Sequence, residues 1–146
     1  MEGILTAELI IGAKHVDKRG TLIFFNELSL EPVKRFYVVE PDNKDTVRAW
    51  QGHKKEQKWF YVLSGSFKVV LLKPDNWEIP GENLDLQEFN LSKDINQILH
   101  IPGGFVNGFQ ALELNSRLMV FSDSTLSKSI ADDFRFDKSL WYEWRN

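Results

Sequence analysis

The segment WFYVLSGSFKVVLL, residues 59–72, carries two short runs of aromatic and aliphatic residues on either side of a turn signal at Gly65. Runs of this composition that are bounded by glycine are typical of β-strands joined by a tight turn. We therefore expect Trp59–Leu63 and Phe67–Leu72 to form strands, and the short turns between such runs imply antiparallel strand order.

The same pattern recurs along most of the chain, with glycine, proline and Asp-Asn pairs between the runs. A regular spacing of short strands predicts an all-β sandwich or barrel. Only Ser124–Asp133 resembles a helix, and it is short. The 146 residues contain no repeat and no linker, so we expect one domain spanning residues 1–146. The six further expected strands are Thr21–Phe25, Val33–Glu40, Thr46–Gln51, Leu86–Leu91, Gln97–Ile101 and Arg117–Ser122.

Two segments are expected to lie outside this pattern. Lys73–Asn83 is predicted to be a surface loop. Residues 134–146 are rich in aromatic side chains. We expect that segment to pack on its own barrel or on a second subunit.

The composition excludes several classes of function. The chain has no cysteine, so thiolate catalysis and thiolate metal sites are impossible. With 18 Lys and Arg against 21 Asp and Glu, the net charge is −3, and no polybasic run favours nucleic acid. No stretch approaches the ~20 apolar residues that cross a bilayer. The first residues lack the pattern of a secretion signal, so we expect a cytoplasmic protein without a membrane partner.

A first polar cluster lies in VRAWQGHKKEQK, residues 47–58. Gln51 and His53 share one face of an extended strand, because side chains alternate. If that face lines the barrel interior, His53 could meet Tyr37, Arg48 and Lys58. A group that titrates near neutrality beside fixed positive charge suits a substrate with a phosphate and a carbonyl.

A structural role is the alternative for each of these residues. His53 could begin a solvated loop, since the run that follows it is strongly polar. Tyr37 could pack in the core as a strand aromatic. Arg48 and Lys58 could be solvated charges at the rim.

A second cluster, IPGGFVNGF at residues 101–109, is predicted to be a tight turn that leads into a strand with Asn107 facing inward. A purely structural hairpin is the alternative, because Pro-Gly-Gly is common in turns.

Together the two clusters resemble the two cupin motifs, in which histidines and a glutamate normally hold a metal. Gln51 stands at the first histidine position and Asn107 at the last, so at most His53 remains as a ligand. One imidazole does not hold a catalytic metal. The resemblance thus predicts a double-stranded β-helix (cupin) barrel without metal or other cofactor.

Among metal-free cupins, the chain resembles the sugar-nucleotide 3,4-ketoisomerases of the WxcM-like group. The matching motifs lie at Asp17–Leu22, Lys34–Val39 and Arg48–Lys55, and the stretch at Asp132–Arg135 loosely matches a fourth. The dTDP-4-dehydrorhamnose 3,5-epimerases are more distantly similar, through residues 101–109 and Lys58.

The resemblance implies proton transfer next to a carbonyl, through an enediol or enolate. Gln51 matches the first active-site histidine of the family and cannot act as a base, whereas His53 matches the second. The expected roles are catalysis for His53 and Tyr37, and substrate binding for Arg35, Arg48, Gln51, Lys58 and Asn107.

The expected function is therefore a homodimeric 3,4-ketoisomerase or epimerase of a nucleotide-linked 4-keto-6-deoxy sugar, with dTDP as the expected nucleotide, in surface polysaccharide biosynthesis. The alternative is a non-catalytic cupin that binds a sugar nucleotide or supports a partner enzyme.

Overall fold

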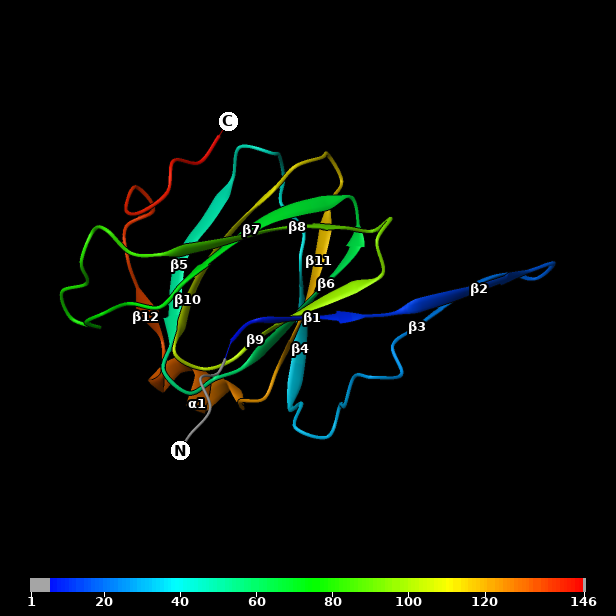
Figure 1. Ribbon diagram of the computed structural model, residues 1–146, viewed down its shortest axis with the longest axis horizontal. Coiled ribbons are helices and arrows are strands. Elements are labelled where there is room, and N and C mark those ends of the chain that lie inside the picture. The colour runs from blue at the N-terminus through cyan, green and yellow to red at the C-terminus, as the bar shows by residue number, and fades with distance from the viewer. Residues whose placement is uncertain (1–5, 146) are drawn as a thin grey trace.

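The computed structural model describes residues 6–145, and most of them form two five-stranded antiparallel sheets that face each other (Figure 1). In spatial order, the first sheet consists of β1 (Glu8–Ile11), β9 (Gln97–Ile101), β6 (Lys58–Ser64), β11 (Arg117–Ser122) and β4 (Arg35–Val39). The second consists of β12 (Phe134–Arg135), β5 (Val47–His53), β10 (Phe105–Ala111), β7 (Ser66–Leu72) and β8 (Leu86–Ser92).

The strands predicted from composition are confirmed, with small differences at their ends. The quoted segment forms β6 and β7, which follow each other in the chain but belong to different sheets, so they are neighbours without pairing. Every strand pair in the described part of the chain is antiparallel, as predicted. Gly65 makes the turn between them with a φ of 70°. A Cβ at this position would also collide with Ser116. Both the positive φ and this close contact therefore require glycine.

The core lies between the two sheets and follows the alternation of side chains along each strand. On β6, Phe60 and Val62 point inward and are buried, and on β11 Leu118 and Val120 do the same. Phe109 of β10 meets the ring of Phe60 edge to face, with 5.6 Å between the centroids. Because every second residue faces the core, the polar residues on the same faces also point into the sandwich.

The aromatic C-terminal segment covers the outer face of the second sheet. Trp50 is buried there, and its Nε1 donates a hydrogen bond to the Leu140 carbonyl oxygen. Trp141 and Trp144 both contact the Trp50 ring at a centroid distance of 5.5 Å. The expectation that this segment packs on its own barrel is confirmed for the described residues.

Two smaller elements complete the fold. Strands β2 (Ala13–Asp17) and β3 (Gly20–Phe24) form a ribbon that extends away from the two sheets (Figure 1). Helix α1 (Leu126–Ala131) follows β11, and Thr125 caps its first turn. It lies inside the predicted range Ser124–Asp133. Within residues 6–145, no helix has the length and apolarity that a membrane span needs.

The loop predicted at Lys73–Asn83 is confirmed as a segment without strands or helices. Its Trp77 packs against Phe134, with 5.0 Å between the ring centroids. The loop therefore helps to cover the start of the C-terminal segment.

Candidate active site

A cavity of about 680 Å³ opens between the two sheets, beside helix α1. Four strands, the helix and the segment after it supply its walls. Its lining residues are Arg35, Tyr37, Val39, Val47, Arg48, Ala49, Trp50, Gln51, Lys58, Phe60, Asn107, Phe109, Leu126, Ser129, Ile130, Asp133, Arg135 and Phe136.

The structure brings six of the seven predicted site residues to this cavity: Arg35, Tyr37, Arg48, Gln51, Lys58 and Asn107. The seventh, His53, follows Gln51 by two residues on β5. Gln51 pairs with Asn107, and His53 pairs with Phe105, whose ring belongs to the core. His53 therefore lies on the inner face of the sheet but is not among the residues that line the cavity.

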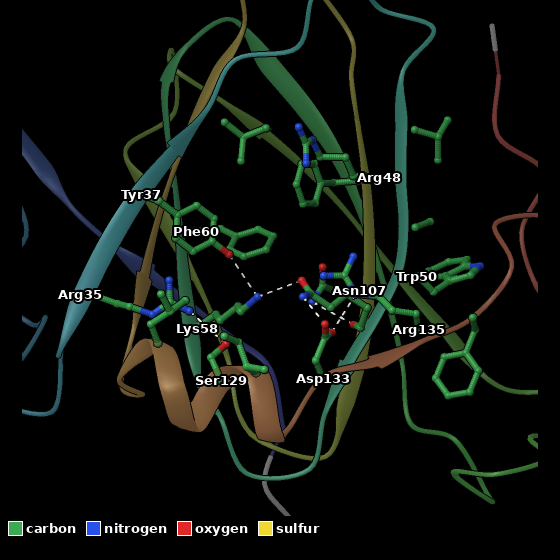
Figure 2. A pocket seen from close by; sticks show the side chains of 18 residues that line it. Arg35, Tyr37, Arg48, Trp50, Lys58, Phe60, Asn107, Ser129, Asp133 and Arg135 are labelled. Carbon is green, nitrogen blue, oxygen red and sulfur yellow. Dashed lines mark hydrogen bonds and ion pairs between the residues drawn. The ribbon is translucent and has the colours of Figure 1, made fainter.

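Lys58 lies at the centre of the site (Figure 2). It begins β6 and precedes the core residue Phe60 by two positions, so the strand directs its side chain inward. The residue is only 4% exposed. Its Nζ donates hydrogen bonds to Tyr37 Oη and Gln51 Oε1, each 3.1 Å long. A solvated rim position for Lys58 is therefore wrong.

Gln51 connects Lys58 to the segment after α1. Its Nε2 donates a 3.1 Å hydrogen bond to Asp133 Oδ1, and Arg135 Nε donates to the same oxygen at 2.8 Å. Burial alone would raise the pKa of Asp133, but the hydrogen bonds from Arg135 and Gln51 outweigh it and lower the pKa. Asp133 is therefore a carboxylate at neutral pH.

Arg35 and Arg48 differ in the contacts that their guanidinium groups make within residues 6–145. Arg35 donates to the Ser124 carbonyl oxygen and to Ser129 Oγ, and it lies 3.5 Å from Glu56 Oε2. Its guanidinium is thus tied to the helix end of the cavity. Arg48 forms no hydrogen bond or ion pair with any residue in the described part of the chain, so its guanidinium is available to a ligand.

Asn107 is buried, and its Nδ2 donates a 3.3 Å hydrogen bond to the Gln51 backbone carbonyl oxygen. The side chain therefore braces β5 next to the cavity. Its Oδ1 remains available as an acceptor for a ligand hydroxyl.

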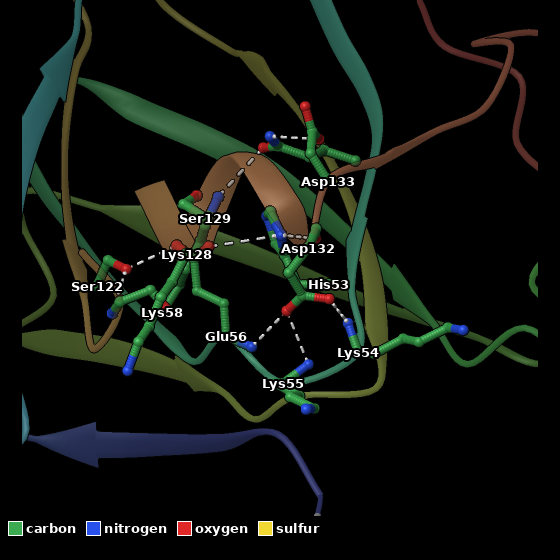
Figure 3. A network of polar contacts seen from close by, with 12 residues as sticks. His53, Lys54, Lys55, Glu56, Lys58, Ser122, Lys128, Ser129, Asp132 and Asp133 are labelled. Atoms are coloured by element: carbon green, nitrogen blue, oxygen red, sulfur yellow. Dashed lines mark hydrogen bonds and ion pairs between the residues drawn. The ribbon is translucent and has the colours of Figure 1, made fainter. Parts of the chain in front are cut away.

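His53 is oriented by a backbone carbonyl (Figure 3). Its Nδ1 lies 2.7 Å from the Asp132 carbonyl oxygen, which only accepts, so Nδ1 carries the proton. Nε2 is buried and has no hydrogen-bond partner among residues 6–145. Burial and the positive charge of Lys58 lower the pKa of His53, outweighing the opposite effect of Glu56. The neutral ring thus keeps a lone pair on the buried Nε2.

The residues after His53 are held by Asp132 (Figure 3). Its carboxylate accepts hydrogen bonds from the backbone N–H groups of Lys54, Lys55 and Glu56, at 2.8–2.9 Å. Lys54 and Lys55 are exposed, whereas His53 and Glu56 are each 3% exposed. The alternative of a solvated loop is therefore correct for Lys54 and Lys55 and wrong for His53.

No curated protein sequence is significantly similar to this chain. The WxcM-like, C-terminal family, in contrast, matches it over residues 6–139, nearly the whole length. The chain belongs to the WxcM-like, C-terminal family.

Solved structures with the same fold include sugar-nucleotide enzymes. A variant of the 3,4-ketoisomerase QdtA from Thermoanaerobacterium thermosaccharolyticum, in complex with TDP-4-keto-6-deoxyglucose, is 22% identical with a TM-score of 0.73, and the match covers 92% of this chain and 90% of that one. The TDP-quinovose 3,4-ketoisomerase WlaRB from Campylobacter jejuni is 18% identical with a TM-score of 0.72, over 91% and 95% of the two chains.

A dTDP-4-dehydrorhamnose 3,5-epimerase from Bacillus anthracis, with TDP and PPi bound, is 22% identical with a TM-score of 0.75, over 94% of this chain and 84% of that one. At these identities the likeness concerns the fold. It confirms the predicted cupin barrel.

The polar residues Ser129, Asp133 and Arg135 line the cavity of this WxcM-like protein but were not predicted, and neither was the position of Glu56 beside His53. Asp133 and Arg135 belong to Asp132–Arg135, which loosely matches a family motif. This match could have identified both residues from the sequence. Glu56 is buried next to His53 and accepts a 2.6 Å hydrogen bond from Ser122 Oγ. The described residues contain no group of three His, Cys, Asp or Glu side chains that could hold a metal ion.

Proposed function

We propose that this WxcM-like protein is a metal-independent isomerase of dTDP-linked 4-keto-6-deoxy sugars that serves surface polysaccharide biosynthesis in the cytoplasm. The observation that carries the proposal is the buried ammonium of Lys58, held between Tyr37 and Gln51 inside a polar cavity. Family membership and the sugar-nucleotide enzymes among its structural neighbours support the substrate class.

Lys58 stabilises the charge that develops during the reaction. When a proton leaves the carbon next to the sugar carbonyl, the electron pair moves to the carbonyl oxygen and gives an enolate. A fixed, buried ammonium lowers the energy of that oxyanion. An ammonium group has three N–H donors, and two of those of Lys58 are used within the protein, so one remains for the substrate.

His53 and Tyr37 exchange the protons. The Nδ1–H bond of His53 to the Asp132 carbonyl leaves Nε2 unprotonated, and the lowered pKa keeps it so at neutral pH. His53 is the proposed base that accepts the proton from carbon. Because its Nε2 is buried behind the cavity lining, the substrate carbon has to approach it past the lining residues at the inner end of β5. The Tyr37 oxygen accepts from Lys58, so its own O–H points away from that bond and donates its proton to the enolate oxygen, which gives the enediol. The tyrosinate then takes the proton of the neighbouring hydroxyl, and His53 returns its proton to the former carbonyl carbon.

The remaining lining residues hold the substrate. Arg48 has a free guanidinium that suits a diphosphate oxygen, and Arg35 adds positive charge at the helix end. Asn107 Oδ1 accepts a sugar hydroxyl, and Gln51 fixes the position of Lys58.

The second candidate is a cupin that binds a sugar nucleotide without converting it. The absence of His53 from the cavity lining favours it. The two candidates differ in turnover, which can be measured with dTDP-4-keto-6-deoxyglucose by NMR of the sugar protons. The isomerase produces a new keto sugar, and the His53→Asn variant binds dTDP normally but loses turnover. Normal dTDP binding by the unmodified protein, without any new sugar signals, would favour the binding role.

We also propose that the protein works as a homodimer. The ribbon β2–β3 exposes Val16 and Leu22, each more than 60% accessible, and Phe36 is 60% exposed on β4, the last strand of its sheet. A second copy would cover these apolar side chains and the unpaired strand edge. Light scattering should give twice the mass of one chain, and the mass of a single chain would contradict the proposal.

A further inference from the structure

The side-chain amide of Gln51 has only one orientation that satisfies both of its partners. Asp133 is an ionised carboxylate, which accepts hydrogen bonds, and Lys58 is an ammonium, which donates them. The NH₂ of Gln51 must therefore face Asp133, and its Oε1 must face Lys58. The carboxylate and the ammonium thus favour the same orientation, and the carboxylate anchors the NH₂ end of the amide.

Asp133 is itself held in place from two sides. The short strand β12 pairs with β5, with Phe134 opposite Gly52 and Arg135 opposite Gln51. Arg135 Nε also donates to the carboxylate oxygen that Gln51 contacts. The backbone pairing and this ion pair fix Asp133 beside Gln51, at the edge of the cavity (Figure 2).

We propose that Asp133 is a positioning residue that acts through Gln51 to hold the Lys58 ammonium against Tyr37, so that the third N–H of Lys58 points at the reacting oxygen of the substrate. This inference rests on the proposed isomerase function and adds a residue to it. Asp133 does not touch the reacting atoms. Its effect passes along four groups in series: Asp133, Gln51, Lys58 and Tyr37.

Removal of the carboxylate has a defined consequence. Without Asp133, the NH₂ end of Gln51 loses its acceptor, and the side chain can swing so that Oε1 no longer holds Lys58 in one place. The ammonium then moves away from Gln51 and loses its alignment with Tyr37. A displacement of about 1 Å at a catalytic group can cost about 10²-fold in rate, while substrate binding through the arginines is little affected.

The test compares Asp133→Ala and Asp133→Asn with a control, Asp137→Asn. Asp137 is exposed on the same segment, and among the described residues its carboxylate accepts hydrogen bonds only from Ser139. We expect Asp133→Ala to lower kcat about 10- to 100-fold with KM within about threefold of the unmodified protein. Asp133→Asn keeps an acceptor oxygen for Gln51 and should recover most of kcat, and Asp137→Asn should match the unmodified protein.

A second readout does not depend on turnover. The side-chain Nε2 protons of Gln51 are assigned by NMR from their loss in Gln51→Ala. We expect the signal of the Gln51 proton that is bonded to Asp133 to be displaced from its position in free glutamine in the unmodified protein and in Asp133→Asn, and to move to the free-glutamine position in Asp133→Ala. A kcat of Asp133→Ala equal to that of the unmodified protein, a change in KM alone, or unchanged Gln51 signals would each overturn the inference.

The two proposals fail in different ways. If the unmodified protein converts no keto sugar, the proposed function fails, and the Gln51 signals still decide whether Asp133 orients the amide. If turnover is present and Asp133→Ala keeps it in full, the function stands and the positioning role is refuted.

Discussion

Replacement of Lys58 by methionine removes the buried ammonium and keeps an unbranched side chain of similar length. In the structure the ammonium has two hydrogen bonds, to Tyr37 and Gln51, and it forms no ion pair with a carboxylate of residues 6–145. The substitution therefore separates what the charge does for catalysis from what it does for folding.

The catalytic loss follows from the role of the charge. Removal of one donor that stabilises an oxyanion typically lowers kcat by about 10²- to 10³-fold, or about 3–4 kcal/mol. We expect a loss in this range for Lys58→Met, with dTDP affinity changed little because Arg48 and Arg35 still line the cavity.

The effect on stability has the opposite sign. A 4% exposed ammonium without a carboxylate partner has given up most of its hydration, and methionine removes that cost. Tyr37 and Gln51 lose a donor, but both line the cavity, where water can replace it. We therefore expect the free energy of unfolding to stay constant or to rise by about 1 kcal/mol.

Steady-state turnover and urea unfolding measure the two effects on the same preparation, with Lys55→Met as the control because Lys55 is an exposed lysine on the neighbouring loop. The reasoning is refuted if Lys58→Met keeps kcat within threefold of the unmodified protein. It is also refuted if the variant loses more than about 2 kcal/mol of stability, since Lys58 would then be a structural residue.

Three further predictions concern the same chain. Tyr37→Phe should lower kcat about 10²-fold or more without changing dTDP affinity, because it removes the proposed proton donor; an unchanged kcat excludes that role. Burial lowers the pKa of His53 and of His100 below the ordinary 6.5, so the unfolded state binds more protons, and the free energy of unfolding should fall as pH decreases from about 7 to 5. Urea titrations should show a weaker decrease in His53→Asn, and an equal slope would contradict the assignment. Dialysis against EDTA should leave turnover intact, whereas a loss restored by one divalent metal would contradict metal independence.

Much of the fold could be predicted because its strands are short runs with clear ends. The runs that became β3 to β9 and β11 are all rich in branched and aromatic residues. Strands β1, β2 and β12 were missed. The run containing β1 is broken by Glu8, and β12 is two residues long, so neither has a usable period. Strand β1 pairs with β9 and strand β12 pairs with β5, and both partners are distant in the chain.

Site residues that lie on predicted strands could be predicted from the alternation of side chains. Gln51 and Tyr37 lie on predicted strands and face the cavity. Lys58 was predicted as a site residue but lies one position before the predicted strand, and the observed β6 starts with it. The surroundings of His53 were not predictable, because Asp132 lies 79 residues away in the chain and covers it from the end of α1. The polar run after His53 predicted a solvent-exposed loop, because the sequence nearby does not reveal that Asp132 covers it. The folded chain buries His53 and Glu56.

The central claim is proton transfer next to a sugar carbonyl, and deuterium exchange tests it most directly. The protein is incubated in D₂O with dTDP-4-keto-6-deoxyglucose, and proton NMR follows the carbons beside the carbonyl. We predict loss of one of these proton signals, faster than without protein and abolished in His53→Asn and Lys58→Met, together with new signals of an isomerised sugar. Retention of every carbon-bound proton, in a sample where the nucleotide sugar is demonstrably bound, would contradict the claim.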